Sequence, residues 1–171
     1  MKPFIGLKKI WYGAPLAEQP DSYAAVTALV AGMTAVENVH EGTWSYSQDD
    51  PSVTDYINML TGQPYYRDVT NGGNKTIAFT MGVYEFEDLV AFQGGEKVGE
   101  DGWKAGAPAL VYKGIVAQTK TGNYIVFSNA GIIGKTAAAE QNLGLGVTAV
   151  AMDSATEGVA AEYRFKAPEN A

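Results

Sequence analysis

The residue best suited to acid–base or metal chemistry is His40, the only histidine of the chain, which lies between Glu37 and Glu41. Imidazole and carboxylate groups bind zinc and copper, but a metal site needs further ligands that converge at a recognisable spacing. The only further ligands that the sequence supplies near His40 are carboxylates. The chain also has no cysteine, which excludes disulfides and thiolate zinc sites. We therefore expect no metal and no cofactor, and the role of His40 stays open.

Two groups of carboxylates are further candidates for metal binding or acid–base chemistry. Asp49-Asp50 and Asp55 could suggest calcium, but alternating oxygen donors, a central glycine and a closing glutamate are missing. The acids of Glu85–Asp88 could form a general acid–base pair. They are better explained as charges at the start of a helix, where the helix dipole favours them. We expect a solvated turn in the first case and a helix start in the second.

Two glycine patterns resemble nucleotide motifs only in part. Gly131–Thr136 ends in Gly-Lys-Thr, but its two glycines are three residues apart rather than five, and no parallel βα unit is evident. Gly144-Leu145-Gly146 lacks the third glycine of a dinucleotide fingerprint and lies inside a β pattern. Nothing in the sequence therefore requires an enzyme, and we expect none.

Aromatic residues are the remaining candidates for recognition. Trp44 and Tyr46, with Tyr65-Tyr66, could form a platform on which sugars or bases stack. Half-buried aromatic residues of strands are more common, and an interface between subunits would use the same residues. A binding role and an assembly role both stay open at this point.

Composition limits the class of protein. The 171 residues suit one domain, and 46% hydrophobic with 18% charged residues predicts a chain that folds unaided. The net charge is −7, and residues Glu37–Asp101 hold twelve acids against three bases, which is consistent with one acidic surface. An acidic chain lacks the basic stripe that a nucleic-acid clamp needs. Residues 1–13 lack the uninterrupted apolar run of a signal peptide, and Ala24–Val36 is too short for a membrane span.

Alternating residues and turn signals predict a mainly β protein. Strands are expected over Ile5–Tyr12, Glu41–Ser47, Thr76–Val83, Pro108–Thr119, Asn123–Ile133, Leu143–Met152 and Val159–Lys166. The last four should form two hairpins, and Asn71-Gly72-Gly73-Asn74 predicts a further hairpin turn ahead of Thr76–Val83. Val53–Leu60 is ambiguous between helix and strand, and Glu96–Gly106 should be a polar loop.

Helical patterns are short. A helix over Ala24–Ala31 would be capped by Asp21 or Ser22 and ended by Gly32. A second helix is predicted over Glu85–Phe92, whose Phe86, Leu89 and Val90 share one face and should pack on the sheet. The fold class is therefore a single domain over residues 1–171, an antiparallel β-sandwich or small barrel with one flanking α-helix.

A series of segments follows one another in a characteristic order along nearly the whole chain. They are Gly6–Gly13, Asn38–Thr43, an acidic Asp-Pro turn, Thr54-Asp55-Tyr56, Leu60-Thr61-Gly62, Thr76–Gly82, the helix ended by Gly-Gly, Leu143–Met152 and Glu162–Phe165. This order resembles the major tail (tail tube) protein family of long-tailed bacteriophages. The resemblance is one of layout, since none of these motifs is a diagnostic signature.

That resemblance implies a structural virion protein whose copies form rings, hexameric in the family, stacked into a hollow tube through which DNA passes without specific binding. The type VI secretion tube shares this fold. Partners would be further copies and other tail proteins such as the tape measure, with no membrane, and the family brings no catalytic residues. The excursion Glu41–Asp68 would reach a neighbouring ring. The expected assembly surface comprises Trp44, Tyr46, Asp49, Asp50, Tyr56, Ile57, Tyr65 and Tyr66. The alternative is a β-sandwich that binds carbohydrate or protein on a virion or cell surface.

Overall fold

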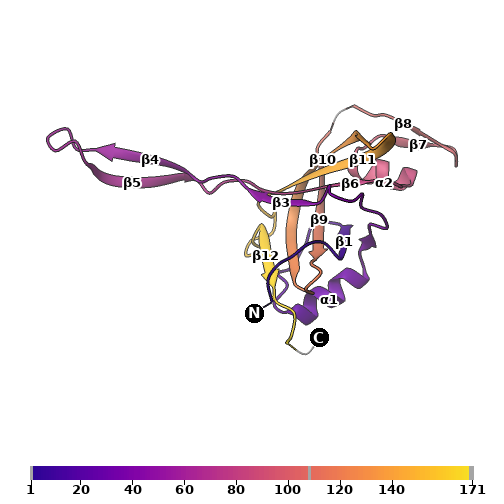
Figure 1. The fold of residues 1–171 in the computed structure, drawn as a ribbon, viewed down its shortest axis with the longest axis horizontal. Coiled ribbons are helices and arrows are strands. Elements are labelled where there is room, and N and C mark those ends of the chain that lie inside the picture. Colours follow the sequence, from indigo (N-terminus) through magenta and orange to yellow (C-terminus); the bar gives the residue numbers. More distant parts are fainter. Residues whose placement is uncertain (1, 108, 170–171) are drawn as a thin grey trace.

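The computed structural model describes residues 2–107 and 109–169. Within these ranges the chain is mainly antiparallel β structure with two short helices (Figure 1). The helices are α1 (Tyr23–Ala31) and α2 (Phe86–Phe92). The strands are β1 (Lys9–Gly13), β2 (Thr34–Ala35), β3 (Ser45–Gln48), β4 (Ser52–Ile57), β5 (Pro64–Asn71), β6 (Lys75–Met81), β7 (Glu96–Val98), β8 (Gly102–Lys104), β9 (Val111–Gln118), β10 (Tyr124–Ala139), β11 (Asn142–Ala151) and β12 (Glu162–Phe165).

One sheet forms the body of the molecule. Its strands follow the order β2-β1-β9-β10-β11-β6-β3, and β12 pairs with the start of β10. Strand β10 is long enough to pair with β12 over Tyr124–Phe127 and then with β11 over Ala130–Ala139. A register shift between Phe127 and Ala130 separates the two parts. The central strand thus joins both halves of the sheet.

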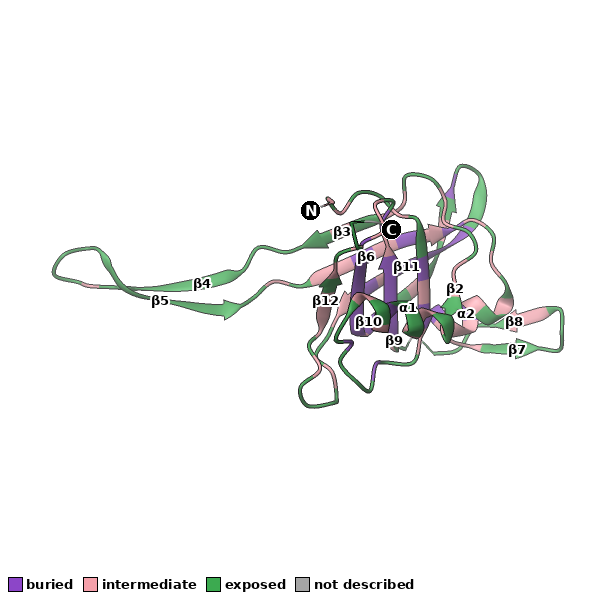
Figure 2. Cartoon of the chain, turned by 90° about the horizontal axis from the view of Figure 1, so that it is seen from below, coloured by how far each residue is buried: buried purple, intermediate pink, exposed green. Residues whose placement is uncertain are grey.

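Alternation along the central strands gives the sheet two buried faces. Ile115 and Ala117 of β9 point into one core, whereas Val116 between them points into the other. The larger core lies on one face of the sheet and includes residues of β1, β6, β9, β10 and β11. Leu89 and Phe92 of α2 also belong to this core. Burial is confined to this body, as Figure 2 shows. The fold is therefore the expected antiparallel sandwich with a flanking helix.

Helix α1 covers the second core. Ser22 caps it, accepting a hydrogen bond from the Ala25 amide at 3.1 Å, and Gly32 ends it, as the sequence predicts. Its buried Val26 packs with Val116 and Val126. Neither helix in the described ranges has the length and apolarity needed to cross a lipid bilayer.

Helix α2 confirms the second helix prediction but changes its packing face. Glu85 and Asp88 form a capping box, and Asp88 also accepts a hydrogen bond from the Tyr12 hydroxyl at 3.0 Å. Leu89 is buried and Phe86 packs at the edge of the core, as expected. Val90 lies outside that core, and its place is taken by Phe92, which is fully buried against Tyr12 and Phe79.

Several predicted pairings are wrong. Asn71–Asn74 does not turn a hairpin between its flanking strands, because β5 pairs with β4 and β6 pairs with β3. Leu143–Met152 and Val159–Lys166 do not pair, since β12 joins β10. The predicted loop Glu96–Gly106 contains the β7–β8 hairpin.

The first strand also begins later than predicted, at Lys9, and Ile5 is exposed. Val83 lies beyond the end of β6 and is exposed. The hairpin of β9 and β10 is confirmed, although Pro108, the predicted start of its first strand, lies outside the described residues.

The packing of α2 gives a first test. Phe92→Ala should lower the free energy of unfolding by about 3–5 kcal/mol, because it removes a fully buried ring and leaves a cavity. Val90→Ala removes two half-exposed methyl carbons and should cost about 1 kcal/mol or less. Urea denaturation of both variants measures the difference. Equal losses would contradict the assigned helix face.

Candidate assembly surface

An arm projects from the body between β3 and β6 (Figure 1). We define the arm as residues 49–74, which comprise β4, β5 and their connections. Among the described residues, strands β4 and β5 pair only with each other, and every residue of both is exposed. The ambiguous segment Val53–Leu60 thus forms strand β4 and the start of a turn. The predicted excursion Glu41–Asp68 is shifted, because β3 belongs to the body and the arm continues to Asn74.

The two faces of the arm carry different pairs. Val53 lies opposite Val69, and Asp55 lies opposite Arg67, on one face. Arg67 donates two hydrogen bonds to Asp55, at 2.5 and 2.9 Å, and these bonds lower the pKa of that carboxyl. On the other face the rings of Tyr56 and Tyr66 lie 5.6 Å apart. Both faces therefore combine polar groups with large apolar surface.

The tip of the arm exposes two large apolar side chains. The turn is closed by hydrogen bonds from the Asn58 amide to the Gln63 carbonyl and from the Gly62 amide to the Asn58 carbonyl, both 2.8 Å. Met59 and Leu60 lie inside this turn with exposed fractions of 98% and 95%. No residue of the ribbon shields them, so burial of these side chains requires another surface.

A narrow neck joins the arm to the body. The Asp49 amide donates to the Asn74 carbonyl at 2.9 Å. Gly73 has φ of +80°, and a Cβ atom there would overlap the Asp49 carbonyl oxygen. The glycine pair predicted to form a hairpin turn thus has another structural role. It lets the two segments of the chain that lead into and out of the arm approach closely where the ribbon leaves the sheet.

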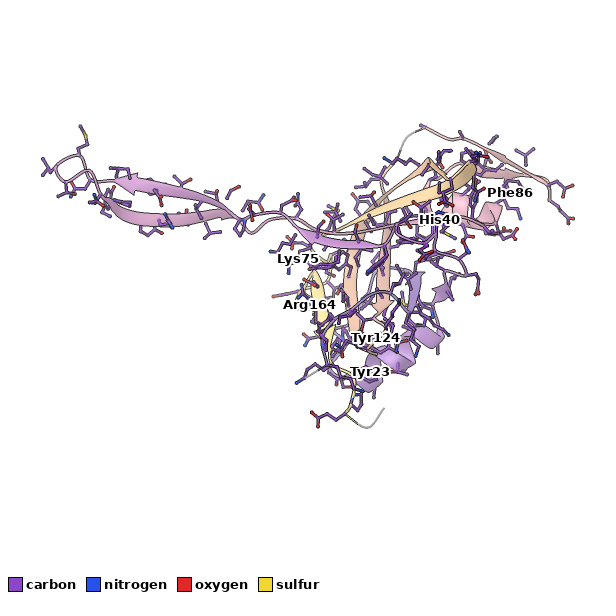
Figure 3. All side chains as sticks on the ribbon, in the orientation of Figure 1. Tyr23, His40, Lys75, Phe86, Tyr124 and Arg164 are labelled. Carbon is purple, nitrogen blue, oxygen red and sulfur yellow. The ribbon has the colours of Figure 1, made fainter. Side chains whose placement is uncertain are left out.

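Below the neck, a buried carboxylate fixes the base of the arm. Glu162 of β12, with a side chain only 5% exposed, accepts from Lys75 of β6 at 2.6 Å and from Arg164 at 2.7 Å. The Tyr46 hydroxyl of β3 donates to it at 3.0 Å, and the Arg164 guanidinium lies over the Tyr46 ring. Figure 3 shows Lys75 and Arg164 on this side of the body. The cluster joins the last strand to both strands that carry the arm.

The charges of this cluster are strongly coupled. Burial alone would raise the pKa of Glu162, but hydrogen bonds from Lys75, Arg164 and Tyr46 outweigh it and hold that pKa below its usual range. Burial, followed by the bond to Glu162, raises the pKa of Tyr46. The carboxylate is therefore charged and the phenol neutral at physiological pH.

The eight expected assembly residues fall into three places. Trp44 and Tyr46 are half-buried against the body core, so they anchor the base of the arm. Asp49 and Asp50 are exposed at the neck. The four exposed residues on the ribbon are Tyr56, Ile57, Tyr65 and Tyr66.

Sequence reasoning missed the tip and the buried charge. Met59 and Leu60 could have been identified as two apolar residues beside Thr61-Gly62, a turn signal that places them at a loop tip. The role of Glu162 had no local signal, because its partners lie on strands far away in the sequence.

The acidic residues do not share one surface. Of the twelve acids in Glu37–Asp101, the arm carries four, whereas six lie at α2 or in the β7–β8 hairpin at the opposite end of the molecule (Figure 1). The four on the arm are Asp49, Asp50, Asp55 and Asp68. There Glu87 pairs with Lys97, and Glu96 pairs with Lys104 at 2.6 Å. The expectation of a single acidic surface is therefore wrong.

Residues with potential chemistry lie apart from one another. In the described ranges no three histidine or acidic side chains converge as metal ligands. His40 donates its backbone amide to the Thr80 carbonyl at 2.7 Å. Gly131–Thr136 lies within strand β10, and Gly144–Gly146 within β11, so neither forms a phosphate-binding loop before a helix.

The buried cluster predicts a pH-dependent stability. Glu162→Gln should lower the free energy of unfolding by roughly 1.5–3 kcal/mol at pH 7, because hydrogen bonds to a charged group are lost. The folded pKa of Glu162 is lowered, so its contribution is complete above the unfolded value of about 4.3 and is lost as pH falls through the folded value. The stabilities of wild type and variant should therefore approach each other as pH falls below about 4.3 and become equal only below the folded pKa of Glu162.

Glu87→Gln is the matched control, since Glu87 is an exposed acid that also pairs with a lysine. The Glu87→Gln substitution should leave the free energy of unfolding unchanged at pH 7 and at low pH. A gap between wild type and Glu162→Gln that persists at low pH would contradict the assignment.

Similarity to known proteins does not supply a function for this geometry. No protein-family model matches the chain, and no curated protein matches it. The resemblance to tail tube proteins rests on the layout of the segments given above. The function must therefore be inferred from the exposed arm and the body that carries it.

Proposed function

We propose that this protein is a structural subunit that assembles with copies of itself into rings, stacked as the tube of a phage tail. The observation that carries the proposal is the arm, a two-stranded ribbon with large apolar side chains on both faces and at its tip. An isolated two-stranded hairpin is at best marginally stable in water. The arm therefore gains a stable environment when a second subunit covers it.

The body supports the same function. Its antiparallel sheet with a flanking helix agrees with the architecture that the resemblance implies. Closed rings also remove the exposure of sheet edges, because each edge strand meets the same contact in the next subunit. Strands β2 and β3 are the two ends of the strand order and offer such edges.

The charge fits a conduit better than a clamp. A net charge of −7 repels the phosphates of DNA, so DNA would pass through the tube without specific binding. The partners would be further copies of the chain and other tail proteins such as the tape measure. The subunit would reside in the virion.

A shortened subunit tests the role of the arm. Replacing residues 49–74 by Asn-Gly joins Gln48 to Lys75, which are already paired, through a two-residue turn. Tyr46, Lys75 and Glu162 all remain, so the body should keep its fold and its circular dichroism spectrum. Negative-stain microscopy at high protein concentration should show tubes for wild type and, at most, unstacked rings for the shortened chain.

The comparison is informative in both directions. If the shortened chain forms tubes of normal length, the arm is not required for assembly. Monomers alone from the wild-type chain, across a range of salt and divalent cations, would overturn the proposed function.

A binding module is the second candidate, because Tyr65 and Tyr66 are 68% and 58% exposed. A specific hit on a glycan array that is lost in Tyr65→Ala would favour it.

Trp44 argues against a binding platform shared with Tyr65 and Tyr66, since it packs on the core at the base of the arm. Trp44→Ala should lower stability, and no loss of stability would contradict that position.

A further inference from the structure

We propose that Asn71 is a site of spontaneous covalent modification, where the main-chain nitrogen of Gly72 displaces the side-chain amide group. Asn71-Gly72 is the only Asn-Gly pair in the chain, and it lies where β5 ends and the chain returns to the body. Both residues are exposed. The only co-reactant is water. The inference is independent of the proposed function, because it concerns the single chain.

The space around the attacking nitrogen is open. Gly72 has no side chain, and a Cβ atom added there would meet no atom within 4 Å apart from its chain neighbours. Any other residue in this position would place a side chain beside the approaching amide group, whereas glycine permits the close approach. Exposure also lets hydroxide reach the N–H group of Gly72 and remove its proton.

A hydrogen bond holds the Asn71 side chain in a conformation that favours the attack. The Gly73 amide donates to Asn71 Oδ1 at 2.9 Å. Such a bond, from a backbone group two residues on, folds an asparagine side chain back along its own main chain. The nitrogen of Gly72 lies between the two bonded residues. The bond thus shortens the path from this nitrogen to Asn71 Cγ.

The same hydrogen bond stabilises the charge that the reaction creates. When the Gly72 nitrogen bonds to Cγ, negative charge develops on Asn71 Oδ1, and a donor already placed at 2.9 Å lowers the barrier. The fold holds this donor in place, since Gly73 has φ of +80° and lies close to the Asp49 carbonyl. The geometry of the neck therefore adds to the reactivity of the Asn-Gly pair.

The reaction proceeds in two balanced steps. The Gly72 nitrogen, after loss of its proton, forms a bond to Asn71 Cγ, and the bond from Cγ to Nδ2 breaks. Nδ2 takes up a proton and leaves as ammonia, so that a succinimide ring remains. Water then adds to either carbonyl carbon of the ring, and the bond from that carbon to the Gly72 nitrogen breaks. Addition at Cγ gives aspartate, whereas addition at the main-chain carbonyl carbon gives isoaspartate.

Isoaspartate changes the structure of the neck. Its main chain runs through the former side-chain carbonyl and gains one methylene group. Asn71 pairs with Ser52 across the ribbon, and Gly73 follows at the contact with the Asp49 carbonyl. The longer main chain cannot keep both contacts in place. Both products also carry a carboxylate in a neck that already holds Asp49 and Asp50. The modification therefore loosens the attachment of the arm with time.

Peptide mapping by mass spectrometry tests the site on the full chain. The chain is aged at mildly alkaline pH, and isoaspartate is detected with protein isoaspartyl methyltransferase. Asn58 is the matched reference in the same digest, because the Leu60 amide donates to Asn58 Oδ1 at the same 2.9 Å but the next residue is Met59. Asn71 should react faster than Asn58 by about tenfold or more, since only its nitrogen neighbour is unobstructed. Equal rates at the two sites overturn the proposal.

A variant and a peptide separate the contribution of the sequence from that of the fold. Gly72→Ala fits the open space, so it should keep the circular dichroism spectrum and slow the reaction by about tenfold or more. The free peptide of residues 69–75 has the same Asn-Gly pair without a fixed Gly73 donor, so the folded chain should react at least as fast as the peptide. An undiminished rate in Gly72→Ala, or a folded chain slower than the peptide, overturns the proposal.

Limited proteolysis tests the effect on the neck. Aged wild-type chain should be cut faster within residues 49–74 than fresh chain, because local opening exposes the backbone to the protease. Gly72→Ala chain aged for the same time should be cut at the rate of its own fresh sample. Equal cutting of fresh and aged wild-type chain, when the aged sample contains isoaspartate, overturns the proposed loosening of the neck.

Discussion

The arm leaves the body as only two strands, and two strands alone cannot bury either of their faces. A sheet gains stability when one face packs on another layer, and the described part of the chain provides no such layer for this ribbon. Its apolar residues, among them Val53, Tyr56, Met59 and Leu60, therefore stay in contact with water until another molecule covers them. Exposed apolar patches of this kind mark interaction sites. This constraint connects the shape of the monomer to assembly.

The body is built to hold such a ribbon at a defined position. The last strand, β12, joins the sheet through β10 and brings Glu162 against Tyr46 and Lys75, which lie on the two strands that continue into the arm. A buried carboxylate with three donors is costly to disrupt, because any lost partner leaves charge without compensation. The neck above it is narrow, since Gly73 allows close contact with the Asp49 carbonyl. The direction of the arm is thus set by the body.

Local patterns in the sequence predict individual elements well. The alternation of Ile77, Phe79 and Met81 identifies β6, and Ser22 and Gly32 mark the ends of α1, because periodicity and caps act over a few residues. Strand partners are harder to predict. Asn71–Asn74 has the composition of a hairpin turn, but positive φ serves equally well at a neck, and only the pairing of β3 with β6 distinguishes the two. The pattern of α2 predicts a packing face that includes Val90, whereas the observed face is rotated by a fraction of a turn and buries Phe92 instead. Within the candidate site, the exposed arm residues could be predicted, whereas the burial of Trp44 and the Glu162 cluster depend on contacts between distant segments.

The central claim is that the arm is unprotected in the single subunit and becomes covered by another copy. Hydrogen–deuterium exchange tests it directly, by comparing the backbone amides of β4 and β5 in dilute monomer and in assembled particles. The account predicts fast exchange along both strands in the monomer, slow exchange in the assembly, and amides of β9 and β10 that are protected in both. Arm amides that exchange equally fast in assembled particles, or that are already protected in the monomer, would contradict it.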